Sequence, residues 1–304
     1  MPPTRLRAAA VDPDVTATAA TAIDRPAPAA VLLQVLAAGG YGVWLWLGLS
    51  LLLGLSPLGR SGVLVPLALG ATLVGIGLLL AVLRVPGLAR WHGWLPRPYH
   101  RPPRSALLLL ATGLPVLAVA GLAQGNNSFW ITRLAGAVLM LCSLVSLLQA
   151  TLDDRAGLPP PLYRATALLP TCRITMAAYN GGLWLWLSVS AQDKFSSDRG
   201  IYLWALLLLA LALGLGLLES ALWQSLREPE AAASETAPER NRFPARLLAG
   251  LLTYALPCTA LLLGGVTGNL PAAAVAALAC TLGLLLGRHL YEGALAATAS
   301  PKSG

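Results

Sequence analysis

Ionisable side chains inside apolar stretches are the first candidates for chemistry in this sequence. A charged group is costly within lipid, so one that lies there often marks a functional site. We predict an intramembrane polar cluster near one end of two apolar stretches. Its central residues either pair with each other or extend separately to the lipid head groups. The cluster comprises Glu219, Arg288, His289 and Glu292, and the pair in question is Glu219 with Arg288.

The residue sets needed for most other chemistry are missing. The four cysteines form no CxxC pair and there are only three histidines, which disfavours a disulfide framework or a zinc site. The sequence contains no phosphate-binding glycine loop, nucleophile elbow or HExxH motif. Asp153 and Asp154 form a single acidic pair without the second acidic motif that a magnesium site of the prenyltransferase type needs. We therefore expect no catalytic residue, no metal and no cofactor.

The connection over residues 86–104 is the most unusual stretch, because arginines and aromatic residues alternate among prolines. Basic and aromatic side chains can stack on nucleic acid, but a short loop between two membrane spans disfavours that partner. We expect contact with anionic lipid head groups, and docking of a cytoplasmic protein is the alternative. This candidate docking loop contains Arg90, Trp91, His92, Trp94, Arg97, Tyr99 and Arg101.

Long apolar segments must position these residues. Of the 304 residues, 56% are hydrophobic and only 11% are charged, whereas soluble domains carry about a quarter charged residues. A span needs about 20 apolar residues, and the runs do not alternate as barrel strands would. We predict an all-α membrane protein with eight transmembrane helices over 29–55, 62–84, 105–124, 129–151, 174–192, 201–223, 245–267 and 271–291.

Basic residues set the orientation. With eight spans, both termini lie on the same side, and 17 of the 21 Lys and Arg residues fall on that side. Because cytoplasmic loops retain the basic excess, we expect both termini to be cytoplasmic in a cell inner membrane. The first 28 residues lack an apolar signal-peptide core, so we expect them to be a retained, disordered cytoplasmic tail.

The two halves of the sequence also resemble each other. The segment from Tyr41 to Ser50 recurs, with one residue skipped, from Asn180 to Ser190, and further matches follow in the same order. Each half has four spans, an even number, so a duplication would give two parallel repeats. We predict a first repeat at 29–152, a cytoplasmic connection at 153–173, a second repeat at 174–292 and a tail at 293–304. The paired residues include Trp44 with Trp184, Pro115 with Pro257 and Cys142 with Cys280.

The length, span count and two four-helix halves are similar to those of the anchor subunits of DMSO-reductase-type enzymes. The segment Gly287-Arg288-His289-Leu290-Tyr291 resembles their closing helix. That resemblance implies electron donation from quinol to a docked enzyme. The chain departs from it at Arg84-Val85-Pro86-Gly87, where those subunits have a histidine-bearing loop, and in the side on which its termini lie. The outline also resembles haem A synthase, but the histidine pairs that this would imply are absent.

Three functions from different classes remain. The first is a non-enzymatic membrane subunit, or an assembly or anchor factor, that contacts other subunits of a membrane complex through loops and small-residue helix faces. The second is a transporter of a small or lipid-like substrate between the two repeats. The third is a lipid-modifying membrane enzyme. A polar cavity between the halves would favour transport, whereas a closed bundle would favour the subunit.

Overall fold

The computed structural model describes residues 28–55, 59–83, 104–123, 129–156, 166–192, 198–233, 239–267 and 270–299. Within these ranges the chain is helical and has no strand. The candidate docking loop lies outside the described residues, as do residues 1–27 of the first predicted tail and residues 300–304 of the second. The helices are α2 (Pro28–Leu53), α3 (Arg60–Leu83), α5 (Arg104–Leu122), α6 (Trp130–Ala156), α8 (Leu169–Ser190), α9 (Asp198–Ala233), α10 (Glu239–Gly250), the π-helical turn η1 (Leu251–Ala255), α11 (Leu256–Thr267) and α12 (Leu270–Ala299).

Because α10, η1 and α11 follow one another without a break, the described chain forms eight helical columns, the number that the sequence predicts. Five helical segments are long and apolar enough to cross a membrane: Val31–Leu53, Trp130–Leu152, Leu203–Ser225, Phe243–Gly264 and Leu270–Leu295. Two shorter apolar helices cover Arg60–Ile76 and Ala111–Leu122. Helix α8 contains Arg173 and Asn180 among its residues and is buried along most of its length.

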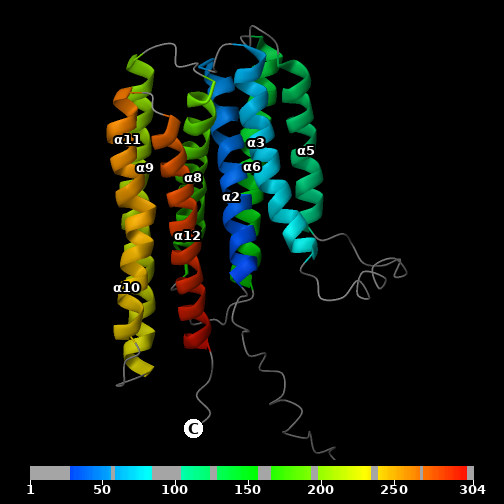
Figure 1. Ribbon diagram of the computed structural model, residues 1–304. Helices are drawn as coiled ribbons and strands as arrows, with labels where there is room; N and C mark the ends of the chain where they lie inside the picture. The colour runs from blue at the N-terminus through cyan, green and yellow to red at the C-terminus, as the bar shows by residue number, and fades with distance from the viewer. Residues whose placement is uncertain are drawn as a thin grey trace, which may run out of the picture.

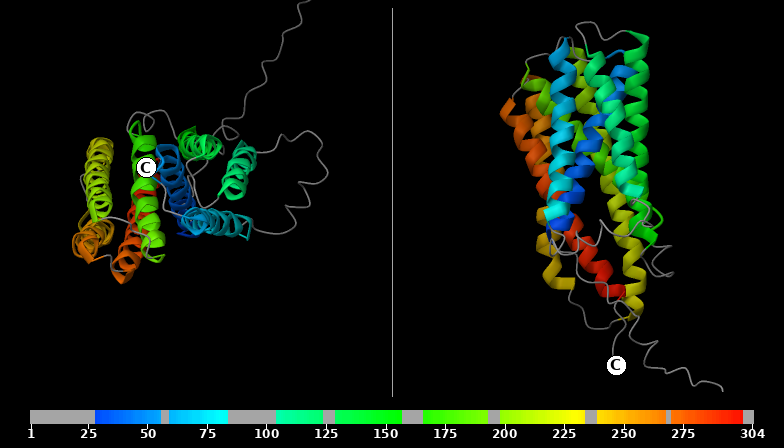
Figure 2. Two further views of the ribbon diagram at one scale, coloured as in Figure 1. Left: turned by 90° about the horizontal axis from the view of Figure 1, so that it is seen from above. Right: turned by 90° about the vertical axis from the view of Figure 1, so that its right-hand side faces the viewer.

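The helices run side by side, and the start of α2 lies at the same end of the bundle as the end of α12 (Figure 1). Seen from above, α2 and α8 lie at the centre, with α5 and α6 towards one side and α9, α10 and α11 towards the other (Figure 2). Helix α2 packs against α3, α6 and α8, and α8 packs in turn against α9 and α12. We call α2, α3, α5 and α6 the first half, and α8 to α12 the second half.

The seam between the halves is the contact of α2 with α8, and two glycines allow it. A side chain at Gly42 would overlap the carbonyl group of Ala177, and one at Gly181 would overlap the backbone of Gly42. Without Cβ atoms the two backbones can approach this closely, as small residues permit where no hydrophobic force drives helices together. On the same seam, the Trp46 indole N–H donates to the carbonyl oxygen of Ala178 at 2.7 Å.

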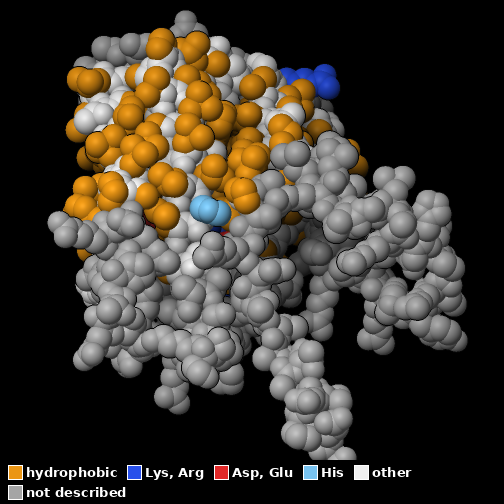
Figure 3. All heavy atoms as spheres, turned by 60° about the horizontal axis from the view of Figure 1, so that its bottom comes forward, with side chains coloured by type: hydrophobic (Ala, Val, Ile, Leu, Met, Phe, Trp, Pro, Cys, Tyr) orange, Lys and Arg blue, Asp and Glu red, His pale blue; other side chains and the backbone are white. Residues whose placement is uncertain are grey.

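Two apolar cores fill the halves. The first contains Trp44, Leu47 and Leu139, and the second contains Leu183, Trp186 and residues of α9, α11 and α12. The early part of α2 contributes Val31 and Val35 to the second core, so this helix belongs to both. The outer surface is also apolar: Figure 3 shows hydrophobic side chains over most of the described face, with very few charged ones. Such a surface is what a bundle needs in contact with lipid tails.

The seventh column departs from α-helical geometry just before Pro257. In η1 the Leu256 N–H donates to the Leu251 carbonyl, five residues earlier, which defines a π-turn. Pro257 has no N–H to offer the carbonyl of Thr253, and Tyr179 on α8 donates its hydroxyl to that carbonyl at 3.2 Å. A neighbouring helix thus satisfies a backbone group that proline leaves open. Pro115, which the predicted repeat pairs with Pro257, lies inside a continuous α-helix, α5.

Candidate functional site

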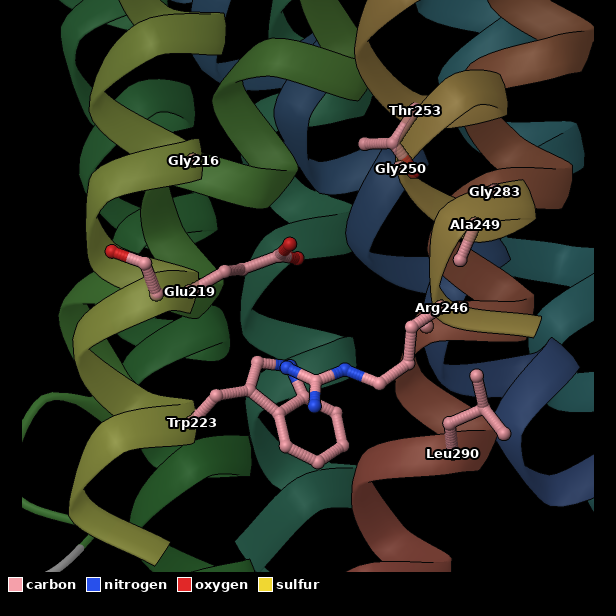
Figure 4. A pocket seen from close by; sticks show the side chains of 11 residues that line it. Gly216, Glu219, Trp223, Arg246, Ala249, Gly250, Thr253, Gly283 and Leu290 are labelled. Carbon is pink, nitrogen blue, oxygen red and sulfur yellow. The ribbon is translucent and has the colours of Figure 1, made fainter. Parts of the chain in front are cut away.

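A pocket of about 180 Å³ lies in the second half, near the end of the bundle where α12 ends (Figure 4). One wall is α9, and the other is formed by α10, η1 and α12. Few α10 residues approach the backbone of α9, whereas α11 packs against it further up, so the pocket occupies the space where the two columns separate. Its lining includes one acidic and one basic side chain, Glu219 and Arg246, and the hydroxyl residues Ser220 and Thr253.

Glu219 extends from α9 towards the opposite wall (Figure 4). Its carboxylate accepts a hydrogen bond from the hydroxyl of Tyr254 at 2.7 Å. Tyr254 belongs to η1, next to Thr253, whose carbonyl receives the Tyr179 hydroxyl. The π-turn therefore places consecutive residues against different neighbours, one against α8 and one against α9. This arrangement fixes an acidic group within a helical segment that is long and apolar enough to cross a membrane.

Arg246 crosses from α10 to α9, where its guanidinium lies 4.0 Å from the centre of the Trp223 ring (Figure 4). This cation–π contact is one that arginine makes well, because its planar group stacks on aromatic faces. The same indole meets Tyr291 of α12 edge-on, with ring centres 5.6 Å apart and planes at 90°. Trp223 thus connects three helices, and it lies one turn after Glu219 on α9.

Glycines shape the wall opposite Glu219. A side chain at Gly283 of α12 would overlap Thr253, so this glycine lets α12 lie directly against η1. Ala279, Gly283 and Gly287 follow one another at intervals of four on α12, and at Gly283 this small-residue face is used for close packing within the bundle. By contrast, a Cβ atom at Gly250 would meet nothing within 4 Å, although this residue also lines the pocket.

The four residues of the predicted polar cluster separate into two places. Arg288 Nε lies 2.8 Å from Glu292 Oε1 on the same helix and donates to Gln34 Oε1 of α2 at 2.9 Å. His289 is exposed. Glu219 lies in the pocket with Tyr254 instead, so the pairing of Glu219 with Arg288, one of the two arrangements considered, is not formed. The physical reason is that the two residues match in depth but face different neighbours around the helix axes.

Sequence reasoning missed the Trp223–Arg246 contact and the role of Tyr254. Trp223 reads as an interfacial aromatic and Arg246 as one of many basic residues near the same membrane face. Both readings are compatible with the sequence, because a contact between α9 and α10 depends on how the columns are rotated. The proximity of Tyr254 to Pro257 was the available signal, since a proline inside a span frees a carbonyl and disturbs the local helix.

Within the described part of the chain, no group of three or more His, Cys, Asp and Glu residues is placed to hold a metal ion. The pocket instead offers one carboxylate, one guanidinium, two hydroxyl groups and an aromatic ring, a set that suits binding of a small polar group. The chain matches no protein-family model, and it matches no curated protein.

Proposed function

We propose that this chain is a multi-pass protein of a cell inner membrane, with two parallel four-helix repeats and both termini in the cytoplasm. In this arrangement 17 Lys and Arg residues lie on the side of the termini and four lie on the opposite side, which supports this orientation. The packing pattern supports the repeats: α2 contacts α3 and α6 much as α8 contacts α9 and α12. Each central helix also touches the last helix of the other half, α6 with α8 and α12 with α2.

We further propose that it acts as a non-enzymatic membrane subunit, or as an assembly or anchor factor of a membrane complex. The close contact of α2 with α8 at the seam between the halves is the observation that supports this proposal. A transporter built from parallel repeats needs a path between the halves. Here Gly42 and Gly181 leave no space for a side chain between α2 and α8, and the Trp46 hydrogen bond crosses the same contact. The polar pocket lies within the second half, away from that seam.

The lipid bilayer, including anionic lipids, and other subunits of the complex are the proposed partners. The candidate docking loop is the proposed contact for a cytoplasmic protein, because its arginines and aromatic residues lie on the side of the basic excess. A lipid-modifying activity gains no support from the pocket, which combines Glu219 with no second acidic group or histidine among its described lining residues.

Co-purification from native membranes tests the subunit proposal. The tagged full chain, extracted in mild detergent, should retain a stoichiometric partner set identified by mass spectrometry. Replacing Arg90, Arg97 and Arg101 by Gln should release that set. The matched control replaces Arg60 and Arg133, on the opposite side of the membrane, and should retain it. If the wild-type chain purifies without partners, or if both variants bind equally, the docking role is wrong.

A further inference from the structure

We propose that the pocket between α9, α10 and α12 binds a zwitterionic head group, with a primary ammonium against Glu219 and a phosphate against Arg246. This inference goes beyond the proposed subunit role and does not depend on it. An ethanolamine phospholipid and free phosphoethanolamine share this chemistry, so the experiment below distinguishes between them.

The carboxylate of Glu219 is the first reason. It lies inside the span Leu203–Ser225, where an ionised group is costly without a partner. Among the described residues its hydrogen bond comes from Tyr254, and no cationic side chain forms an ion pair with it. A carboxylate can accept about four hydrogen bonds, so capacity remains on the pocket side. The hydroxyl of the neighbouring Ser220 donates to the Leu217 carbonyl at 2.8 Å, which leaves its oxygen as an acceptor. An ammonium group matches these acceptors.

Arg246 is the second reason. Its guanidinium lies face-on to Trp223, so the stacking fixes the plane of the group. A guanidinium carries five N–H donors in its plane, so beside its other contacts it can still donate to phosphate oxygens, which it binds well. The residue lies near the start of the span Phe243–Gly264, the depth at which phospholipid phosphates occur when this end faces the membrane surface.

The spacing joins the two groups into one site. Glu219 and Trp223 are four residues apart on the same face of α9, which corresponds to a rise of about 6 Å along the helix axis. Because Arg246 lies over Trp223, the acidic and basic groups of the pocket are separated by about one helical turn. Two carbon atoms separate the amine from the phosphate in an ethanolamine head group, which suits this separation.

The volume of the pocket and the N–H donors that each head group offers distinguish among the candidate lipids. About 180 Å³ accommodates a head group but not an acyl chain. A primary ammonium can donate hydrogen bonds to the Glu219 carboxylate, whereas a trimethylammonium has no N–H donor. A phosphoglycerol head group lacks the cation altogether. We therefore expect the pocket to prefer ethanolamine lipids over choline and glycerol lipids.

Lipid retention by the full chain tests the proposal. The protein is equilibrated in nanodiscs with equal parts of phosphatidylethanolamine, phosphatidylcholine and phosphatidylglycerol with identical acyl chains. It is then transferred to detergent, and retained lipid is quantified by mass spectrometry. The wild type should retain ethanolamine lipid about tenfold over the other two, as expected for one charge-assisted contact. Equal retention of all three lipids would overturn the proposal.

Matched variants locate the site. Glu219→Gln keeps an acceptor for Tyr254 but removes the charge, so the preference should be lost, whereas Glu292→Gln, at the ion pair with Arg288, should keep it. Arg246→Gln should likewise lose it, and Arg133→Gln, on the opposite side of the bundle, should not. If Glu219→Gln and Glu292→Gln retain ethanolamine lipid equally, the assignment to this pocket is wrong.

A variant that keeps both Glu219 and Arg246 tests the site even if the charge variants misfold. Gly250 lines the pocket with open space beside it, so Gly250→Leu should fill the pocket and abolish the preference. Gly214→Leu, also at an open position but outside the pocket lining, should leave it unchanged. Addition of excess phosphoethanolamine to the wild type identifies the source: displacement of the bound lipid indicates a soluble ligand, and continued retention indicates the membrane lipid. Retention of the lipid by Gly250→Leu would contradict the site.

Discussion

Glu219 and Arg288 show what determines the partner of a charged side chain within a membrane. Both lie in the last third of the apolar spans of their helices, Leu203–Ser225 and Leu270–Leu295, and each has a hydrogen-bonding group close by. For Glu219 this is Tyr254, and for Arg288 it is Gln34 together with Glu292. Depth can be inferred from the position in a span, but the direction around the helix axis depends on tertiary packing. For this reason the sequence identifies the residues and misses their partners.

This separation predicts additivity. Glu219→Gln and Arg288→Gln should each change the free energy of unfolding by an independent amount, because Glu219 bonds to Tyr254, whereas Arg288 bonds to Gln34 and Glu292. The double mutant should equal the sum of the single mutants to within about 0.5 kcal/mol. Unfolding in mixed detergent micelles, followed by circular dichroism, gives the three values. If the double mutant loses much less stability than the sum of the single mutants, Glu219 and Arg288 interact directly and the separation described here is wrong.

At the scale of the helices, the seam glycines make a sharp prediction. Gly42→Ala places a methyl group on the Ala177 carbonyl, and the central helices must move apart to accept it. Overpacking of this kind costs about 1–3 kcal/mol or more. Gly75→Ala, in α3 of the same half, adds a methyl group where nothing lies within 4 Å and should cost nothing. Thermal unfolding of the two variants in one detergent measures the difference, and equal midpoints would show that the seam is not tightly packed.

The π-turn offers a second prediction at this scale. Tyr179→Phe removes the hydroxyl that satisfies the Thr253 carbonyl, and a buried acceptor left unsatisfied costs about 1–3 kcal/mol. Pro257→Ala restores an N–H that can serve this carbonyl. The Tyr179→Phe change should therefore cost less in the Pro257→Ala background than in the wild type. The measurement is a double-mutant cycle of unfolding free energies. Identical costs in both backgrounds would show that the Tyr179 hydroxyl does not compensate for the N–H that Pro257 lacks.

The helices themselves are the part of the fold that the sequence predicts best, because length and apolar composition are sufficient to define a span. The π-turn is not predictable in this way. Proline at 115 and proline at 257 look equivalent in the sequence, yet only the segment before Pro257 has a π-turn. The difference comes from the neighbours: Tyr179 provides a donor beside Thr253 and Gly283 provides room for it.

For the whole molecule, the testable expectation concerns orientation. Reporter fusions after residue 55 and after residue 304 should give opposite results, the first outside the membrane and the second in the cytoplasm. The reason is the basic excess on the side of both termini, which the translocation machinery retains. Alkaline phosphatase and green fluorescent protein report the two locations. An external C-terminus would contradict the eight-span orientation, whatever the packing of the helices.

Composition and the apolar runs predict the helical class and the number of columns, because each depends on many residues at once. The pocket could not be predicted, because it is a gap between three columns and its lining comes from separate segments of the chain. Of the charged pocket residues, the sequence singled out Glu219 alone, because an ionised side chain is energetically costly within lipid. Trp223 and Arg246 became significant only once α9 and α10 were placed side by side.

The contacts of α2 have a consequence for synthesis. This helix leaves the ribosome before the other described helices, but its Trp46 bonds to a residue 132 positions later, and its Gln34 to one 254 positions later. At about 5–20 residues per second, the last of these partners emerges roughly 10–50 s after the helix that it completes. During that interval the glycine-lined face of α2 lies open in the bilayer with its indole N–H unmatched by Ala178. A stalled or truncated chain that ends before α8 would keep this face without its partner helix.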